Sequence, residues 1–181
     1  MNHRLSLCFL GTLFLTALNP QQAAGADRPR RVAPIIATIV IPKIGLKATV
    51  REGVARTTLR HAVGHYPGTA GPGQPGNTAL LGHRTTGLAL FRSLDHLTKG
   101  DTVILKTKSH LFRYLVRGKR VITPRRTSVL RPVPFRAGRT PEGGFVSLIT
   151  CHPKGSNAKR LVVVGKLVSE RPLRPHAGQT G

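Results

Sequence analysis

The chain has 181 residues, 39% of them hydrophobic, which is enough for one folded domain with a buried core and short flanking segments. It carries 29 lysines and arginines against 6 acids, a net charge of +23 at pH 7. The basic residues are scattered and aromatic residues make up only 4%, which argues against a nucleic-acid partner. The charge favours a protein that works beside anionic lipids or anionic wall polymers.

The first 26 residues are typical of a targeting segment. A short basic start precedes the uncharged run 5–18, and Ala24-Gly25-Ala26 offers a cleavage site. The run is shorter than the roughly 20 residues of a spanning helix, which favours a cleaved signal peptide, although an uncleaved signal anchor stays open. Residues 27–34 form a basic, proline-containing linker. We therefore expect an exported protein, held at the extracellular face of the cytoplasmic membrane or secreted.

Short strands are predicted from residue 35 onward, because β-branched runs alternate with Gly, Pro and Asn. They are Ile35–Ile41, Leu46–Arg51, Asn77–Gly82, Asp101–Lys108, Leu111–Val116, Lys119–Ile122, Phe145–Cys151 and Leu161–Val168. Only Leu88–Leu97 has helical spacing, residues 64–76 and 123–144 are predicted loops, and residues 171–181 a disordered tail. Residues 35–170 thus form one all-β domain, a closed or nearly closed barrel with long functional loops.

The cysteines are informative about chemistry. Cys8 lies in the targeting segment, so the exported domain keeps only Cys151. A lone thiol cannot form an internal disulfide, and it is either a small buried hydrophobe or a nucleophile.

Three strand ends carry residue types suited to acyl transfer. His83 follows the strand Asn77–Gly82, Cys151 ends the strand Phe145–Cys151, and Arg160 opens the next one. The loop 152–159 can return the chain as an antiparallel neighbour and bring the thiol close to the guanidinium. A thiolate could then attack a carbonyl, an imidazole could move the proton, and the guanidinium could stabilise the oxyanion.

Other residues have weaker claims to these roles. His152 adjoins Cys151, but neighbouring strand residues point to opposite faces, so its imidazole should point away from the sulfur. A zinc site of Cys151, His152 and His83 is disfavoured because no paired ligand spacing accompanies it, and we expect neither metal nor cofactor. Asp95 and Asp101 are the nearest acids, and neither is expected to orient His83. Five other histidines are expected at the surface or in the core: His61, His65, His96, His110 and His176.

At these residues the chain resembles a sortase. The resemblance rests on Leu81-Gly82-His83 at a strand end, Thr150-Cys151 closing a strand, and Arg160-Leu161 opening the next. Further matches are the runs IPKIGL at 41–46 and HYPGT at 65–69, and the resemblance spans about residues 35–168. The runs GHRTT at 82–86 and CHP at 151–153 are most similar to class E, and class D and related classes stay open.

The resemblance implies a closed eight-stranded barrel with one or two short helices and a cysteine transpeptidase working through a thioacyl intermediate. Its donors would be surface proteins with a C-terminal Leu-Pro/Ala-x-Thr-Gly signal cut between Thr and Gly. Its acceptor would be an amine of a peptidoglycan precursor or a pilin.

Residue roles follow from the same resemblance. Cys151 would be the nucleophile, His83 the general acid and base, and Arg160 the oxyanion stabiliser. Tyr66, Thr150 and His152 are expected to bind substrate, with Tyr66 linked to acceptance of Ala after Leu. The arginine-rich loop 123–144 departs from relatives that carry acids there.

Two other interpretations compete with this one. An L,D-transpeptidase would carry a Ser-His-Gly-Cys run, whereas Cys151 follows Ile149-Thr150. An exported basic module that binds wall polymers or other polyanions would leave Cys151 inert.

Overall fold

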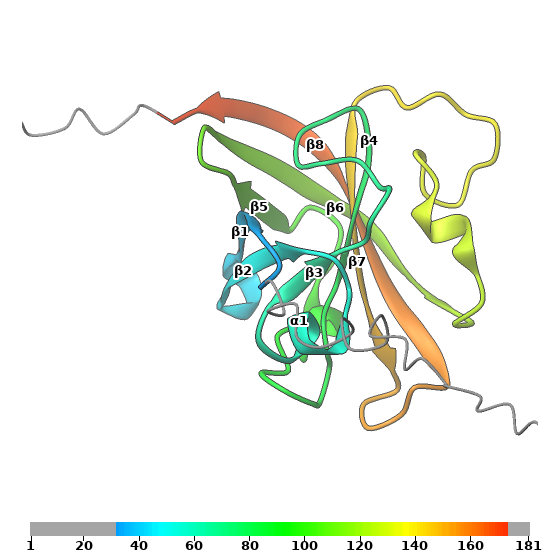
Figure 1. The fold of residues 1–181 in the computed structure, drawn as a ribbon. Coiled ribbons are helices and arrows are strands. Elements are labelled where there is room, and N and C mark those ends of the chain that lie inside the picture. Colours follow the sequence, from blue (N-terminus) through cyan, green and yellow to red (C-terminus); the bar gives the residue numbers. More distant parts are fainter. Residues whose placement is uncertain (1–31, 174–181) are drawn as a thin grey trace, which may run out of the picture. The chain divides into compact units, whose positions relative to one another are not determined.

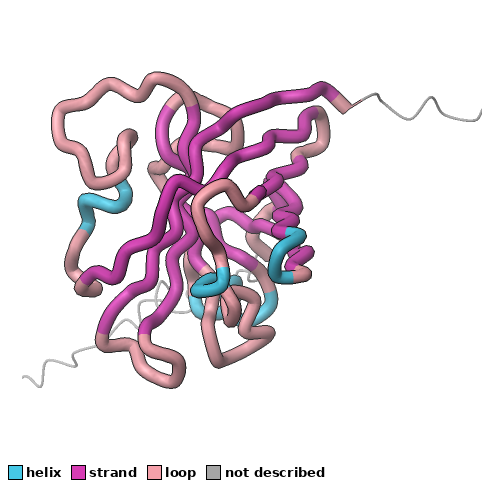
Figure 2. The backbone as a smooth tube through the Cα atoms, turned by 180° about the vertical axis from the view of Figure 1, so that it is seen from behind, coloured by secondary structure: helices cyan, strands magenta, loops and turns pink. Residues whose placement is uncertain are grey.

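The computed structural model describes residues 32–173, which form a closed barrel of eight strands in the order β1-β2-β3-β4-β7-β8-β6-β5 (Figures 1 and 2). The strands are β1 (Ile35–Ile41), β2 (Leu46–Glu52), β3 (Val63–His65), β4 (Gly76–Leu81), β5 (Thr102–Lys106), β6 (His110–Ile122), β7 (Gly144–His152) and β8 (Lys159–Pro172). The helical pieces are α1 (Arg56–His61) and the 3-10 turns η2 (Pro42–Ile44), η3 (Leu94–His96) and η4 (Thr127–Leu130). The predicted all-β barrel with short helices is confirmed.

The strand predictions differ from the structure mainly at a bulge and at one short strand. Two strands were expected within β6, but the ladder with β8 continues through a register shift between Val116 and Gly118, so the chain forms one long strand. The three-residue β3 and the helix α1 lie where no element was expected. A three-residue strand offers too little alternation to be recognised in sequence.

The helix predicted at Leu88–Leu97 is wrong. This segment consists of turns followed by the single 3-10 turn η3. Ala89 has a φ of 47°, in the left-handed region, which an α-helix does not allow. The apolar residues that suggested a helical face are buried nonetheless, and Phe91, Leu94 and Leu97 are each 0% exposed.

Two apolar clusters lie on opposite faces of β4, β7 and β8. The inner cluster fills the barrel and includes Leu80, Leu148 and Val163. The outer cluster consists of Ala79, Ile122, Val129, Ile149 and Val162. Because adjacent strand residues alternate between faces, β7 contributes to both clusters, which explains its nearly continuous apolar sequence.

The segment between β6 and β7, drawn yellow in Figure 1, stands over the outer face of the sheet. It contributes Val129 to the outer cluster, with Leu130 and Phe135 packed against it. The side chain of Asn77 in β4 donates to the carbonyl of Val129 at 2.8 Å, which fastens this loop to the sheet. The segment between β6 and β7 therefore flanks the outer face of β4 and β7.

Several sequence expectations concern the ends of the chain. β8 continues to Pro172, so the domain end predicted at residue 170 falls inside a strand. The targeting segment 1–26, most of the linker 27–34, Cys8 and His176 lie outside the described residues. Within residues 32–173, no helix has the length and apolar character needed to cross a membrane.

Candidate active site

Cys151, His83 and Arg160 are brought together by three neighbouring strands. β4 and β7 run parallel, with Leu81 opposite Ile149, so continuing the register by two residues places His83 beside Cys151. β7 and β8 run antiparallel, and Cys151 is directly paired with Arg160. Adjacent strands lie about 5 Å apart, which puts the three residues at one corner of the sheet.

Strand alternation gives Cys151 and Arg160 a common face, and His83 follows the end of β4 beside them. Cys151 lies on the same face of β7 as Ile149, and Arg160 lies on the same face of β8 as Val162. Ile149 and Val162 both belong to the outer cluster. His83 lies two residues beyond Leu81, and Leu81 also packs against that cluster. All three side chains are half-buried, so the thiol, the imidazole and the guanidinium border the outer face and stay within reach of a ligand.

The strand end before His83 is fixed by close backbone packing. The amide of Gly82 donates to the carbonyl of Ile149 at 3.2 Å, and the amide of Phe91 donates to the carbonyl of His83 at 3.0 Å. A Cβ on Gly82 would lie 2.8 Å from two ring carbons of Phe91. Only glycine lets this ring pack against the backbone, and the ring in turn supports His83.

The position of Arg160 is fixed from the loop between β7 and β8. Its Nη1 donates to the carbonyls of Asn157 and Lys159, at 2.7 and 2.9 Å. A guanidinium has five N–H donors, so these contacts leave others for a ligand beside Cys151. This arrangement suits a group that stabilises negative charge on oxygen.

Thr150 and His152 lie on the opposite face of β7 from Cys151. Thr150 is 2% exposed, and its hydroxyl donates to the carbonyl of Gly82 at 2.8 Å. The predicted contact of Thr150 with substrate is not supported, because its side chain is enclosed and ties β7 to the end of β4. His152 Nδ1 lies 2.9 Å from Nη1 of Arg84, so its imidazole is turned toward Arg84.

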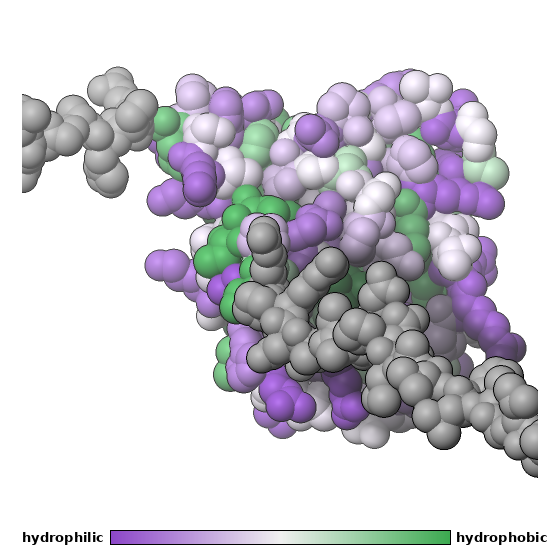
Figure 3. All heavy atoms as spheres, viewed as in Figure 1, coloured by the Kyte–Doolittle hydropathy of each residue, from purple (hydrophilic) through white to green (hydrophobic). Residues whose placement is uncertain are grey.

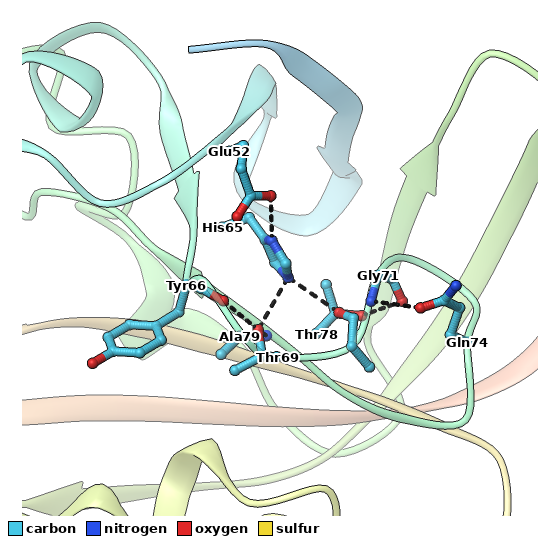
Figure 4. A network of polar contacts seen from close by, with 9 residues as sticks. Glu52, His65, Tyr66, Thr69, Gly71, Gln74, Thr78 and Ala79 are labelled. Atoms are coloured by element: carbon cyan, nitrogen blue, oxygen red, sulfur yellow. Dashed lines mark hydrogen bonds and ion pairs between the residues drawn. The ribbon is translucent and has the colours of Figure 1, made fainter.

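Tyr66 lies beside the outer cluster, where its ring packs on the apolar side chains. Its amide donates to the carbonyl of Ala79 at 2.8 Å, and its carbonyl accepts from the Thr69 hydroxyl at 2.7 Å. Figure 4 shows the ring pointing away from this hydrogen-bonded network. The loop therefore has a fixed backbone and presents the aromatic side chain toward the same cluster as the active-site corner.

A buried histidine holds the Tyr66 loop. His65 is 5% exposed, its Nδ1 lies 2.7 Å from the carboxylate of Glu52, and its Nε2 lies 3.0 Å from the Thr69 hydroxyl (Figure 4). This places His65 among the core histidines that the sequence led us to expect, with a supporting role for Tyr66.

The acids near the site are used elsewhere. Asp95 contacts Arg84 and Lys154, and Asp101 accepts hydrogen bonds from the backbone and hydroxyl of Thr98. Within residues 32–173 no group of three or more His, Cys, Asp and Glu residues could hold a metal ion. Cys151 and His152 also face opposite sides of β7, which does not suit a joint zinc site.

Arg84 has no role predicted from the sequence. It follows His83 and is 3% exposed. In the sequence it appears as one of 29 basic residues, and no local pattern around it indicates a buried side chain.

Comparison with known proteins decides the family. The model of the sortase domain matches residues 39–168. The chain belongs to the sortase family. Sortase SrtE1 of Streptomyces coelicolor is 35% identical over 144 residues, which cover 75% of this chain and 41% of that protein. Sortase D of Bacillus subtilis is 28% identical, covering 86% of this chain and 80% of that protein.

Solved sortase structures share the fold. The crystal structure of sortase E1 from Streptomyces coelicolor with a tripeptide in its active site superposes with a TM-score of 0.71 at 34% identity, covering 79% of this chain and 95% of that one. The SrtA sortase from Actinomyces oris gives a TM-score of 0.74 at 28% identity, covering 84% and 92%. The match to class E agrees with the motifs, and other sortase classes match as well. This chain spans less than half the length of Streptomyces SrtE1.

Proposed function

We propose that this sortase is a cysteine transpeptidase that cleaves a Leu-Pro/Ala-x-Thr-Gly sorting signal between Thr and Gly. It joins the released carboxyl end to an amine of a peptidoglycan precursor or a pilin. The observation that carries the proposal is the convergence of Cys151, His83 and Arg160 at the ends of three adjacent strands. A thiol, a proton carrier and a fixed cation are the groups that acyl transfer requires.

The first half of the reaction forms a thioester. The Cys151 thiolate attacks the Thr carbonyl, and the resulting oxyanion is stabilised by Arg160. The imidazolium of His83 gives its proton to the Gly nitrogen as the C–N bond breaks. The Gly-containing fragment leaves as an amine, and the Thr acyl group stays on the sulfur.

The second half transfers the acyl group. The acceptor amine attacks the thioester carbonyl, and His83 takes its proton. The C–S bond breaks, a new amide forms, and Cys151 returns as a thiolate beside the imidazolium. Both halves use the same three residues, so no cofactor is needed for the balance of atoms and charge.

Recognition of the signal is assigned to the outer face of the sheet. The outer cluster itself is buried, but the residues packed against it are partly exposed and offer an apolar surface for the signal's Leu. They are Tyr66, Leu81, Leu130, Phe135 and Val164. We propose that Tyr66 favours Ala after Leu, so the Leu-Ala-x-Thr-Gly peptide is processed at least as well as the Pro form. Tyr66→Ala should reduce that preference, and a wide advantage of the Pro peptide in wild-type competition kinetics would overturn it.

The proposed location is the extracellular face of the cytoplasmic membrane. Donor proteins are held there by their own tails until they are cut, so a tethered enzyme meets them more often than a free one. The basic run 28–31 fits a segment on anionic lipid, and +23 fits an anionic envelope. Mass spectrometry of the exported protein tests this location, and an N-terminus at Asp27 would contradict the anchor.

A second candidate, a basic wall-binding module, is favoured only by that charge. On the face shown in Figure 3, hydrophilic and hydrophobic side chains are intermixed over the described residues that remain in view. Alkylation of Cys151 separates the two functions, since a binder keeps its affinity and a transpeptidase loses turnover.

The deciding assay uses the full chain with Leu-Pro-x-Thr-Gly and Leu-Ala-x-Thr-Gly peptides and an amine such as triglycine. We expect a product cut after Thr and joined to the amine. Formation of that product by the Cys151→Ala variant at the wild-type rate would refute the proposal.

A further inference from the structure

A buried guanidinium lies behind the catalytic corner. Arg84 follows His83 directly, and its side chain is buried inside the protein at 3% exposure. Its Nη1 donates to the carbonyl oxygen of Cys151 at 3.3 Å and to His152 Nδ1 at 2.9 Å. The side chain of Arg84, which directly follows the proposed base His83, is thus hydrogen-bonded to the backbone of the nucleophile Cys151.

The second terminal nitrogen of the Arg84 guanidinium contacts Asp95 of η3. Nη2 of Arg84 lies 3.1 Å from the Asp95 carboxylate, which is also 3.7 Å from the ammonium of Lys154 in the loop after β7. Burial acts to raise the pKa of Asp95, but a hydrogen bond with its own backbone and the charges of Arg84 and Lys154 outweigh it, so this pKa is lowered. Asp95 is therefore a carboxylate at neutral pH and keeps Arg84 in place.

This network does not satisfy all of its own polar groups. Arg84 Nε and Asp95 Oδ1 are buried without a hydrogen-bond partner in the described part of the chain. Leaving buried polar atoms unpaired costs stability, and well-packed apolar residues often replace a buried ion pair without loss. A purely structural role is thus a poor explanation for an arginine at this position.

The contact with Arg84 also fixes the state of His152. Arg84 can only donate, so Nδ1 of His152 accepts and the ring proton of the neutral imidazole sits on Nε2. An Nδ1–H tautomer would set two donors against each other at 2.9 Å. His152 is held in a single tautomer on the far side of β7 from the thiol, and it is kept out of the proton transfer between Cys151 and His83.

We propose that Arg84 is a positioning residue of this active site. It fixes the peptide carbonyl of Cys151 relative to the His83 strand end and locks His152 in the Nε2–H tautomer. The inference rests on the proposed transpeptidase function, since its kinetic consequence is a loss of alignment between thiol and imidazole. A misplacement of about 1 Å between reacting groups can cost about 100-fold in rate.

The test compares four full-length variants with the wild type. Arg84→Met removes the donors and keeps an extended side chain, and Arg84→Lys restores donors and charge. The double variant Arg84→Met/Asp95→Leu removes both charged partners and so leaves no unpaired buried charge. Arg92→Met is the matched control, because Arg92 is an exposed arginine of the same connection.

For Arg84→Met we expect kcat for the sorting peptide to fall about 10- to 100-fold with KM changed less than about threefold, since alignment and not binding is lost. Arg84→Lys should recover part of the loss, and Arg92→Met should match the wild type. The double variant should melt near the wild-type Tm and still show the low kcat, which separates positioning from folding.

A second readout does not depend on turnover. At pH 8, nitrogen-15 NMR of the His152 ring should show the Nε2–H tautomer in the wild type and a mixture of tautomers in Arg84→Met. A double variant with wild-type Tm and more than half of the wild-type kcat would overturn the proposal, as would a mixed tautomer in the wild type. A wild-type protein that forms no product but shows the single tautomer would count against the proposed function and leave the Arg84 contact standing.

Discussion

Replacing Gly82 by alanine should damage both the stability and the activity of this sortase. The added methyl would lie 2.8 Å from Cδ2 and Cγ of Phe91 and 3.2 Å from Cε2. Phe91 is 0% exposed, and its amide is bonded to the carbonyl of His83, so the ring has little room to withdraw. The strain is therefore expected to move the end of β4 and with it His83.

The size of the effect follows from overpacking. Forcing a methyl group into a filled core costs about 1–3 kcal/mol. For a chain of this length, 1 kcal/mol corresponds to about 2–4 °C in Tm. At about 2 kcal/mol the Gly82→Ala variant should melt about 4–8 °C below the wild type. Its kcat should also fall, even where the variant is fully folded, because His83 is displaced.

Thermal melts and peptide kinetics on three variants test this reasoning. Gly118→Ala is the control, since a methyl group there meets nothing within 4 Å. The double variant Gly82→Ala/Phe91→Leu should recover part of the Tm and of the kcat lost in Gly82→Ala, because the smaller side chain makes room. Wild-type Tm and kcat in Gly82→Ala would refute the argument, and so would a double variant with a lower Tm and kcat than Gly82→Ala.

Three further predictions concern the oxyanion, the barrel core and metals. Arg160→Lys should lower kcat by about 100- to 1,000-fold, because an ammonium presents a different donor geometry; near wild-type kcat would show that Arg160 does not serve the oxyanion. Tyr114 is 0% exposed and its oxygen accepts from the Gly73 amide at 2.8 Å, so Tyr114→Phe should lose about 1–3 kcal/mol, measured by urea unfolding. Burial also raises the pKa of Tyr114, so above about pH 10 the unfolded chain loses this proton first and stability falls; a Phe variant with the same alkaline slope would contradict this. Activity should be insensitive to EGTA, because the loop 123–144 offers only Glu142 as an acid; a loss restored by calcium would count against it.

Much of the barrel could be predicted from the sequence because its strands are β-branched runs between turn residues. β1 has the predicted bounds, and β7 and β8 begin and end within a few residues of them. Tertiary packing decided the rest. Phe91, Leu94 and Leu97 have helical spacing but are buried from a series of turns. The bulge at Arg117, across which β6 continues, depends on the partner strand β8 and has no local signal in the sequence.

The candidate site could likewise be predicted only in part from the sequence. Alternation along β7 places His152 away from Cys151 and also explains why Thr150, expected to bind substrate, is enclosed. The role of Arg84 depends on contacts 67 and 68 residues away in the chain and could not be inferred from its neighbours.

The central claim is that Cys151 carries the acyl group between the two halves of the reaction. Mass spectrometry of the full-length protein mixed with a Leu-Ala-x-Thr-Gly peptide, without an added amine, tests it most directly. We predict an adduct on Cys151 with the mass of the peptide up to its Thr, which disappears on addition of an amine and is absent from Cys151→Ala. Cleavage of the peptide after Thr by Cys151→Ala, or by the wild type with no adduct on Cys151, would contradict the account.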